Sequence, residues 1–173
     1  MEFWDAYDRT RRPLGYTILR GAQMRPGEMI LVVHMAYFNS RGEILVQRRA
    51  DDKDYKPGIW AFTAGAVLAG ETSAQACERE TWEELGFRPD METAMIPISF
   101  MTPDAFVDVY AIRADVELSD MLLQKTEVAE AAWLNRKAFI ALAQDKQKFW
   151  QYRYMDMLIG MFDETEGIWK AST

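Results

Sequence analysis

Three glutamates of this chain have the spacing of neighbours on one helical turn. Glu80, Glu83 and Glu84 stand close to the end of the segment GAVLAGETSAQACERETWEELGF. Residues three and four apart face each other on a helix, so Glu80 faces both of the others, and like charges there cost about 0.2–0.5 kcal/mol per pair. A bound cation offsets that cost, and carboxylates suit hard cations that are shared with substrate phosphates. The three residues therefore predict a Mg²⁺ or Mn²⁺ site that handles a phosphate compound.

The segment around these glutamates has the local signals of a helix between two loops. Thr72 and Ser73 are residue types that cap helix N-termini, and residues 74–85 contain no Gly or Pro. Gly86 stands where a left-handed residue ends a helix. Beside the glutamates, a helix here would bury a stripe of small and apolar residues, namely Ala76, Thr81 and Leu85.

Seven residues of this region match a longer fixed pattern. They are Gly65, Glu71, Arg79, Glu80, Glu83, Glu84 and Gly86. Their spacing resembles the Nudix box, G-x5-E-x7-R-E-U-x-E-E-x-G-U, in which U is a bulky aliphatic residue. At about 6–7% per residue type, such a match arises by chance at roughly one start position in 10⁸. Phe87 suits the last apolar position of the pattern. Thr81 departs from the first apolar position, which should pack the helix on the sheet, so this departure concerns the packing of the helix more than its chemistry. A solvated acidic helix, the common meaning of a charge run, accounts for neither the glycines nor the arginine.

The resemblance extends upstream, to the Nudix branch that includes type I isopentenyl-diphosphate isomerases and their hydrolase relatives. It is carried by Trp4-Asp5-x-Tyr7-Asp8, by Arg12-Pro13-Leu14-Gly15, by Asn39 and Gly42, and by Pro57-Gly58-x-Trp60. The isomerases place a catalytic cysteine, followed by Gly-His, after the last of these turns. This chain has Phe62-Thr63-Ala64-Gly65-Ala66 there, and its single cysteine, Cys77, suits a small buried helix position. Hydrolysis is therefore favoured over isomerisation.

The resemblance also implies roles for the box residues. Glu80 and Glu84 are expected to ligate metal, Glu83 to ligate it or act as base, and the Gly65 carbonyl to complete the shell. Arg79 would orient the glutamates, and Glu71 would brace Arg79. Glu127, in a later loop, is a further candidate base, although a solvated loop carboxylate is its more ordinary interpretation.

Substrate contacts are expected from four other residues. Arg48 and Arg49 end a strand near the box, and because side chains alternate along a strand only one of them faces the cleft. We favour Arg49, since arginine binds phosphate in a bidentate manner. Trp60 stacks on a base or, as a commoner role, anchors a turn by packing. His34, the only histidine, matches a metal-ligand position of the isomerases but is better suited to a core or cleft wall.

These residues together predict a Nudix hydrolase. In family terms, water attacks a phosphorus of a nucleoside diphosphate or its derivative, with Mg²⁺ or Mn²⁺ bound. One alternative is an isomerase-like enzyme acting on a prenyl diphosphate. Another is a non-catalytic Nudix domain that binds a ligand, but such domains commonly lose box glutamates that this chain keeps.

The whole chain is expected to be one Nudix domain, 1–173, with an N-terminal hairpin at 1–20, the box at 65–87 and C-terminal helices at 135–163. The net charge of −7 opposes nucleic-acid binding, which needs basic residues. Runs long enough for a membrane span and a signal peptide are both missing, and a single cysteine suits a reducing compartment. We therefore expect a cytoplasmic protein with a small phosphorylated substrate, and leave a homodimer open.

Apolar segments bounded by turn residues predict the strands of a mixed sheet. They lie at Glu2–Tyr7, Leu14–Leu19, Met29–Asn39, Glu43–Arg49, Trp60–Thr63, Ala94–Met101, Val107–Val116 and Val128–Leu134. Asn135 can cap a helix over Arg136–Gln144, and the aromatic and Met-rich segment Lys148–Phe162 is expected to be a terminal helix. With the resemblance, this order implies an α/β fold, the Nudix α/β/α sandwich with the box helix on one face of a mixed sheet.

Overall fold

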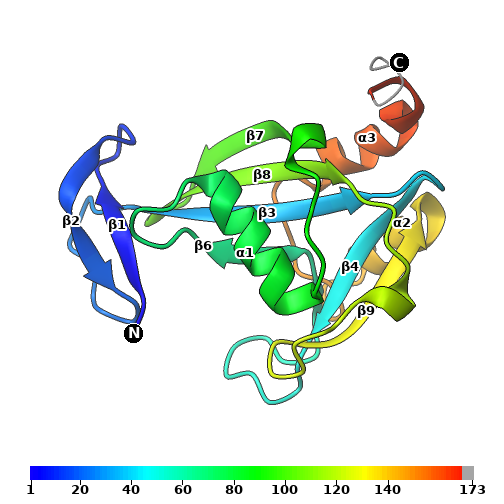
Figure 1. The fold of residues 1–173 in the computed structure, drawn as a ribbon, viewed down its shortest axis with the longest axis horizontal. Helices are drawn as coiled ribbons and strands as arrows, with labels where there is room; N and C mark the ends of the chain where they lie inside the picture. The colour runs from blue at the N-terminus through cyan, green and yellow to red at the C-terminus, as the bar shows by residue number, and fades with distance from the viewer. Residues whose placement is uncertain (169–173) are drawn as a thin grey trace.

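A computed structural model of the protein describes residues 1–168 (Figure 1). Its elements follow the order β1 (Phe3–Tyr7), β2 (Pro13–Leu19), β3 (Ile30–Phe38), β4 (Glu43–Arg49), β5 (Trp60–Ala61), β6 (Thr63–Ala66), α1 (Ser73–Leu85), β7 (Met95–Met101), β8 (Ala105–Arg113), β9 (Val128–Asn135), α2 (Arg136–Gln144) and α3 (Met155–Ile168). Within this range no helix is long and apolar enough to cross a membrane.

The main sheet is mixed, as the sequence predicts. Its central strand β3 runs parallel to β8 and antiparallel to both β4 and β6. Strand β7 pairs antiparallel with β8, and β4 pairs antiparallel with β5 and β9. Because β6 lies next to β3 and connects to α1 through the loop of residues 67–72, the sheet positions the start of the box helix.

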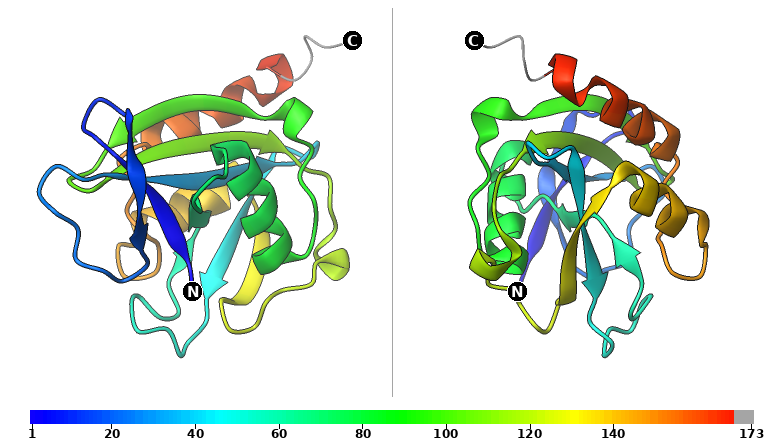
Figure 2. Two further views of the ribbon diagram at one scale, coloured as in Figure 1. Left: turned by 60° about the vertical axis from the view of Figure 1, so that its left-hand side comes forward. Right: turned by 90° about the vertical axis from the view of Figure 1, so that its right-hand side faces the viewer.

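Helices cover both faces of this sheet (Figure 2). Side chains alternate between the faces of a strand, so Val33, Met35 and Tyr37 of β3 pack in a cluster with α1, while Ala36 and Phe38 pack in a second cluster with α2 and α3. The expected α/β/α sandwich is confirmed, with α1 alone on one face.

Thr81 shows how α1 tolerates a hydroxyl at its apolar position. The residue is fully buried, and its Oγ1 donates to the Cys77 carbonyl at 2.6 Å. The Tyr37 hydroxyl, from β3, forms a hydrogen bond with the same Thr81 Oγ1. A buried polar group is costly only when it lacks a partner, so the tyrosine of the strand compensates for the threonine of the helix.

The expected terminal helix begins later than predicted. Residues 148–154 are not helical, and α3 starts at Met155. The backbone of this segment pairs with β5 instead, because Trp60 N donates to Lys148 O at 2.8 Å and Trp150 N donates to Trp60 O at 2.9 Å. Aromatic residues suit strand-like pairing as well as helices, so composition alone misplaced the boundary.

Strands β1 and β2 form a separate two-stranded sheet at one end of β3 and β8 (Figure 1). Tyr7 and Met29 exchange two backbone hydrogen bonds, of 2.8 and 2.9 Å. The side chain of Arg11, in the hairpin turn, makes a bidentate ion pair with the buried Asp108 of β8. The hairpin is therefore docked on the domain by both backbone and side chains.

We expect Arg11→Met to lower the free energy of unfolding by about 2–3 kcal/mol. Removing one partner of a buried ion pair costs about 3–5 kcal/mol, because the other charge stays buried without compensation, and Arg11 is partly exposed, which reduces the effect. Urea denaturation measures the change, with the exposed Arg9→Met in the same turn as the control. Equal stability of the two variants would show that the pair does not hold the hairpin.

Candidate active site

Helix α1 begins and ends as its sequence predicts. Thr72 is the N-cap: its side chain accepts from Gln75 N at 3.2 Å, and the Gln75 side chain accepts from Thr72 N at 2.8 Å, a capping box. Gly86 ends the helix with a left-handed φ of 74°, a conformation that glycine adopts without strain. Both ends are fixed by local residues, so the direction of the box glutamates is set.

The box glutamates line a cleft of about 300 Å³ beside β6. Glu80, Glu83, Glu84 and Gly65 all contribute to its wall. A Cβ at Gly65 would collide with the Glu80 carboxyl group, so a larger residue there would displace this carboxylate from its position at the cleft. Glycine at position 65 therefore leaves the space that the Glu80 carboxylate occupies.

Arg79 holds the acidic side chains around it in place. Its Nε and Nη2 donate to the two Glu71 oxygens at 2.8 and 3.0 Å. Nη1 reaches Glu80 at 2.7 Å and Glu83 at 3.3 Å, and Nη2 also donates to Ala66 O at 2.9 Å. Burial acts to raise the pKa of Glu71, but the hydrogen bonds from Arg79 and Leu68 lower it overall. The structure thus places Arg79 and Glu71 where the resemblance implies a bracing pair.

Glu84 is the most buried carboxylate of the cleft. Only 8% of the residue is exposed, and burial raises the pKa of Glu84 to about 8. Gln47 of β4 donates to the Glu84 carboxylate at 2.6 Å, while Thr63 of β6 donates to the Gln47 carbonyl oxygen at 2.8 Å. This chain of buried hydrogen bonds fixes the orientation of Glu84 against the sheet.

The donor set of the cleft fits a hard divalent cation. Burial also raises the pKa of Glu80, so two carboxylates are held in a poorly solvated place where a cation would compensate them. Within residues 1–168 no three acidic, histidine or cysteine side chains already converge as a metal cluster. Glu80, Glu84 and the Gly65 carbonyl are the groups of the cleft that would hold such an ion.

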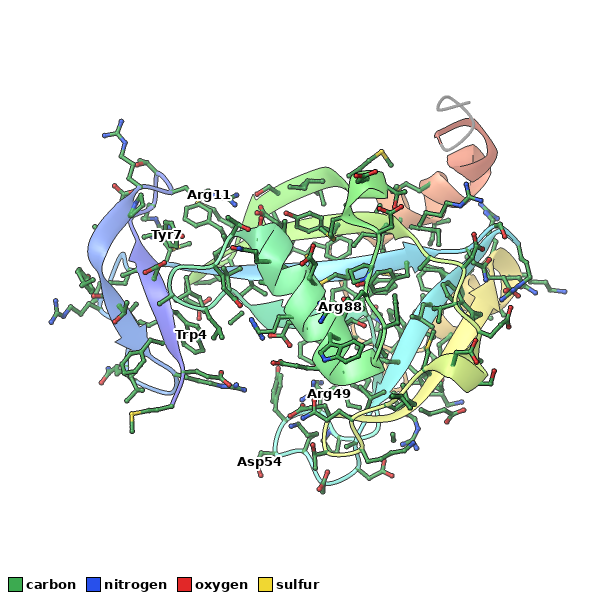
Figure 3. All side chains as sticks on the ribbon, in the orientation of Figure 1. Trp4, Tyr7, Arg11, Arg49, Asp54 and Arg88 are labelled. Atoms are coloured by element: carbon green, nitrogen blue, oxygen red, sulfur yellow. The ribbon has the colours of Figure 1, made fainter. Side chains whose placement is uncertain are left out.

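The two arginines at the end of β4 point to different environments. Arg49 lines the cleft and is labelled below α1 in Figure 3. Arg48 lies outside the residues that line the cleft and pairs with Asp51 at 2.7 Å and Glu130 at 3.5 Å. Of the two arginines expected to contact substrate, Arg48 therefore lies outside the cleft, because strand alternation turns its side chain to the other face.

Glu127 lies at the cleft, where its carboxylate makes an ion pair of 2.6 Å with Lys53. It is thus placed near the box but already has a cationic partner.

A smaller hollow of about 150 Å³ continues from the cleft. The two share Arg49, Ala64 and Glu84, and the hollow adds His34 and four aromatic or polar residues, namely Gln47, Phe62, Trp150 and Tyr152. His34 forms part of its wall, with Nδ1 at 2.7 Å from the Tyr154 hydroxyl, and burial lowers the pKa of His34 to about 4. The histidine is therefore a neutral wall residue.

Trp60 is not among the residues lining either cavity. It packs against the cluster under α2 and α3. Of the two roles expected for Trp60, packing is therefore the one that agrees with its position. Trp150 lines the hollow in its place, with its ring 6.3 Å from that of Tyr152 and tilted by 19°.

Sequence reasoning missed Lys53 as a residue of the cleft, and it missed Gln47, Trp150 and Tyr152 as residues of the hollow. Gln47 had a signal, because it stands two residues before Arg49 and so shares its strand face. The two aromatic residues belong to a segment that we expected to be helix, and their place depends on its pairing with β5.

The structure is that of an α/β protein in which a helix bearing several glutamates packs on a mixed sheet beside a cleft. Comparison with known proteins identifies the family. The model of the NUDIX domain matches residues 29–158. That range covers most of the chain and the whole box. The chain therefore belongs to the Nudix hydrolase family.

Particular relatives support this assignment. The uncharacterised Nudix hydrolase lmo0368 of Listeria monocytogenes is 39% identical over 95% of this chain and 98% of its own length. The isopentenyl-diphosphate Delta-isomerase of Streptomyces griseus is 31% identical over 56% of this chain and 50% of its own length. The crystal structure of DR0079 from Deinococcus radiodurans has a TM-score of 0.73 and 24% identity, and covers 92% of this chain and 98% of that chain. The likeness to DR0079 shows the fold. The match to the isomerase confirms the resemblance to the Nudix branch that includes isopentenyl-diphosphate isomerases.

Proposed function

We propose that this protein cleaves the diphosphate linkage of a nucleoside diphosphate or its derivative, with Mg²⁺ or Mn²⁺ bound. The observation that carries the proposal is the convergence of Glu80, Glu83, Glu84 and Gly65 on one cleft, with Glu84 buried. Bound there, the metal would neutralise phosphate charge and lower the pKa of the attacking water.

The protein's own residues supply binding and orientation. Glu80, Glu84 and the Gly65 carbonyl would hold the metal, and Glu83, which is half-exposed, would ligate or take the proton from water. Arg79 keeps Glu80 and Glu83 in place through its hydrogen bonds. Arg49, at the junction of cleft and hollow, would bind a phosphate oxygen pair.

The hollow beside Arg49 suits the nucleoside. Its wall combines aromatic rings with the polar side chains of His34 and Gln47, the mixture that binding sites use to hold a flat ring and fix its orientation. Trp150 and Tyr152 are its candidate stacking residues.

The site gives no support to the isomerase alternative. The cleft and hollow described here contain no thiol. Cys77 is fully buried in the cluster under α1, and burial raises the pKa of its thiol. Such a group is not available for proton transfer to a substrate.

Arg49→Met is expected to lower kcat/KM at least tenfold, equivalent to about 1.4 kcal/mol, because one phosphate contact is lost. Arg48→Met provides a matched control, since it removes the same group from the adjacent residue outside the cleft; its kcat/KM should stay within about twofold of the wild type. Steady-state kinetics on the two variants measures this. Equal losses at both positions would contradict the assignment of Arg49 to substrate.

The substrate is found with a panel of nucleoside diphosphates and their sugar and nucleotide conjugates in Mg²⁺. Released nucleoside monophosphate or phosphate is measured by chromatography. The proposal predicts cleavage of at least one compound and no conversion of isopentenyl diphosphate. Production of dimethylallyl diphosphate without cleavage of any panel member would replace the hydrolase with the isomerase.

A further inference from the structure

The N-terminal hairpin reaches the catalytic cleft although it lies outside the matched NUDIX range of 29–158. Glu2, Trp4 and Arg20 line the same cleft as the box glutamates. None of them lines the hollow that holds Trp150. The residues shared by the two cavities, Arg49 and Glu84 among them, therefore stand between the hairpin and the hollow.

The hairpin is held rigidly enough to serve as a wall. Besides the Tyr7–Met29 pair and the Arg11 ion pair, Phe3 O accepts from Ala69 N and the Asp5 carboxylate accepts from Gly70 N, both at 2.8 Å. These contacts tie β1 to the loop that leads into the box helix. In Figure 3, Trp4 projects from β1 towards β6 and α1.

Trp4 occupies its position at a cost. Its Nε1 is buried, and no acceptor for it exists within residues 1–168. A buried donor without a partner costs about 1–3 kcal/mol, and such a group calls for an explanation. Packing alone does not demand tryptophan there, because phenylalanine would bring an aromatic ring without the unpaired N–H. The size and face of the indole at the cleft wall give a reason for its presence.

The neighbours of Trp4 add hydrogen-bonding groups at the edge of this wall. Arg20 Nη1 pairs with the Glu2 carboxylate at 2.6 Å, and both side chains are about half-exposed or more. The hydrogen bond that Arg20 donates to Glu2 raises the pKa of Arg20, and the charges of Glu127 and Glu80 add to the effect. Arg20 is therefore close to the box as well as to the hairpin.

We infer that Trp4, with Glu2 and Arg20, contacts the group attached to the far side of the diphosphate, and that this group is a sugar. The inference rests on the proposed function. With the nucleoside in the hollow and the diphosphate at the box, the far group would lie against the hairpin. A sugar ring has an apolar face that packs on an aromatic ring and hydroxyls that need both donors and acceptors, which the guanidinium and carboxylate provide.

The test compares each nucleoside diphosphate with its sugar conjugate: ADP with ADP-glucose, UDP with UDP-glucose, and GDP with GDP-mannose. Trp4→Ala is expected to lower kcat/KM for the conjugates at least tenfold and for the unconjugated diphosphates less than threefold. Trp4→Phe, which keeps a ring, should retain kcat/KM for the conjugates within about fivefold. Leu14→Ala, an exposed residue of β2 outside the cleft lining, should change neither class more than twofold.

Equal losses for the two classes in Trp4→Ala would overturn the inference, because the residue would then act on the shared part or on folding. Calorimetric affinities for the same pairs, measured in a Glu84→Gln background with and without Trp4→Ala, test the wall without turnover. If no compound is cleaved but Trp4→Ala still weakens only the conjugates, the proposed function fails and the hairpin assignment stands. If cleavage occurs and the affinity ratio is unchanged, the hairpin assignment alone fails. If no compound is cleaved or bound, both fail.

Discussion

Glu84→Gln is expected to lower kcat by about two orders of magnitude, or about 2.7 kcal/mol in the barrier, and to leave the fold intact. The side chain keeps its shape but loses the charge that would hold the metal. Gln47 can still donate to the new amide oxygen, as it does to the carboxylate at 2.6 Å. The melting temperature should therefore stay within about 3 °C of the wild type.

Glu78→Gln is the control for this change. It removes a carboxylate from the same helix at a position that does not line the cleft, so its kcat should remain within about twofold of the wild type. Steady-state kinetics and thermal unfolding on both variants separate lost chemistry from lost structure. Similar kcat values for the Glu84 and Glu78 variants would remove Glu84 from the site.

Removal of divalent cations with EDTA is expected to lower activity at least about 100-fold, and added Mg²⁺ or Mn²⁺ should restore it. The physical reason is that a bound cation would stabilise the charged forms of Glu80 and Glu84, which burial disfavours. It would also offset the repulsion between the carboxylates of the cleft and a phosphate substrate.

A second readout shows where the cation binds. A ligand that binds only the folded state raises its stability, so Mg²⁺ should raise the melting temperature of the wild-type protein and have a smaller effect on Glu84→Gln. Full activity in EDTA, with metal content below one tenth per chain in atomic-emission analysis, would contradict a metal-dependent mechanism.

The box could be predicted from sequence because its residues depend on one another locally. Glu80, Glu83 and Glu84 share a helix, and the helix has its own start at Thr72 and end at Gly86. Gly65 is fifteen or more positions away from them, and it leaves the space that the Glu80 carboxylate occupies. The positions of the strands along the chain followed from turn residues and alternating apolar positions, which are also local signals.

The rest of the cleft depends on contacts between distant segments. Gln47 of β4 meets Glu84 only because α1 packs on the face of the sheet to which the Gln47 side chain points. Trp150 reaches the hollow only because its segment pairs with β5. Trp4 comes to the box through backbone bonds at Met29 and Ala69. Periodicity in one sequence reveals which face of an element is apolar, but not which distant element covers it.

The most direct test of the central proposal is cleavage of the best panel substrate in H₂¹⁸O, with the phosphate-containing products analysed by mass spectrometry. If the box directs water to phosphorus, one ¹⁸O appears in one of the two phosphate products per cleavage. The rate of labelling should fall about 100-fold in Glu84→Gln. Unlabelled products, or equal labelling rates in the wild type and Glu84→Gln, would contradict hydrolysis at this site.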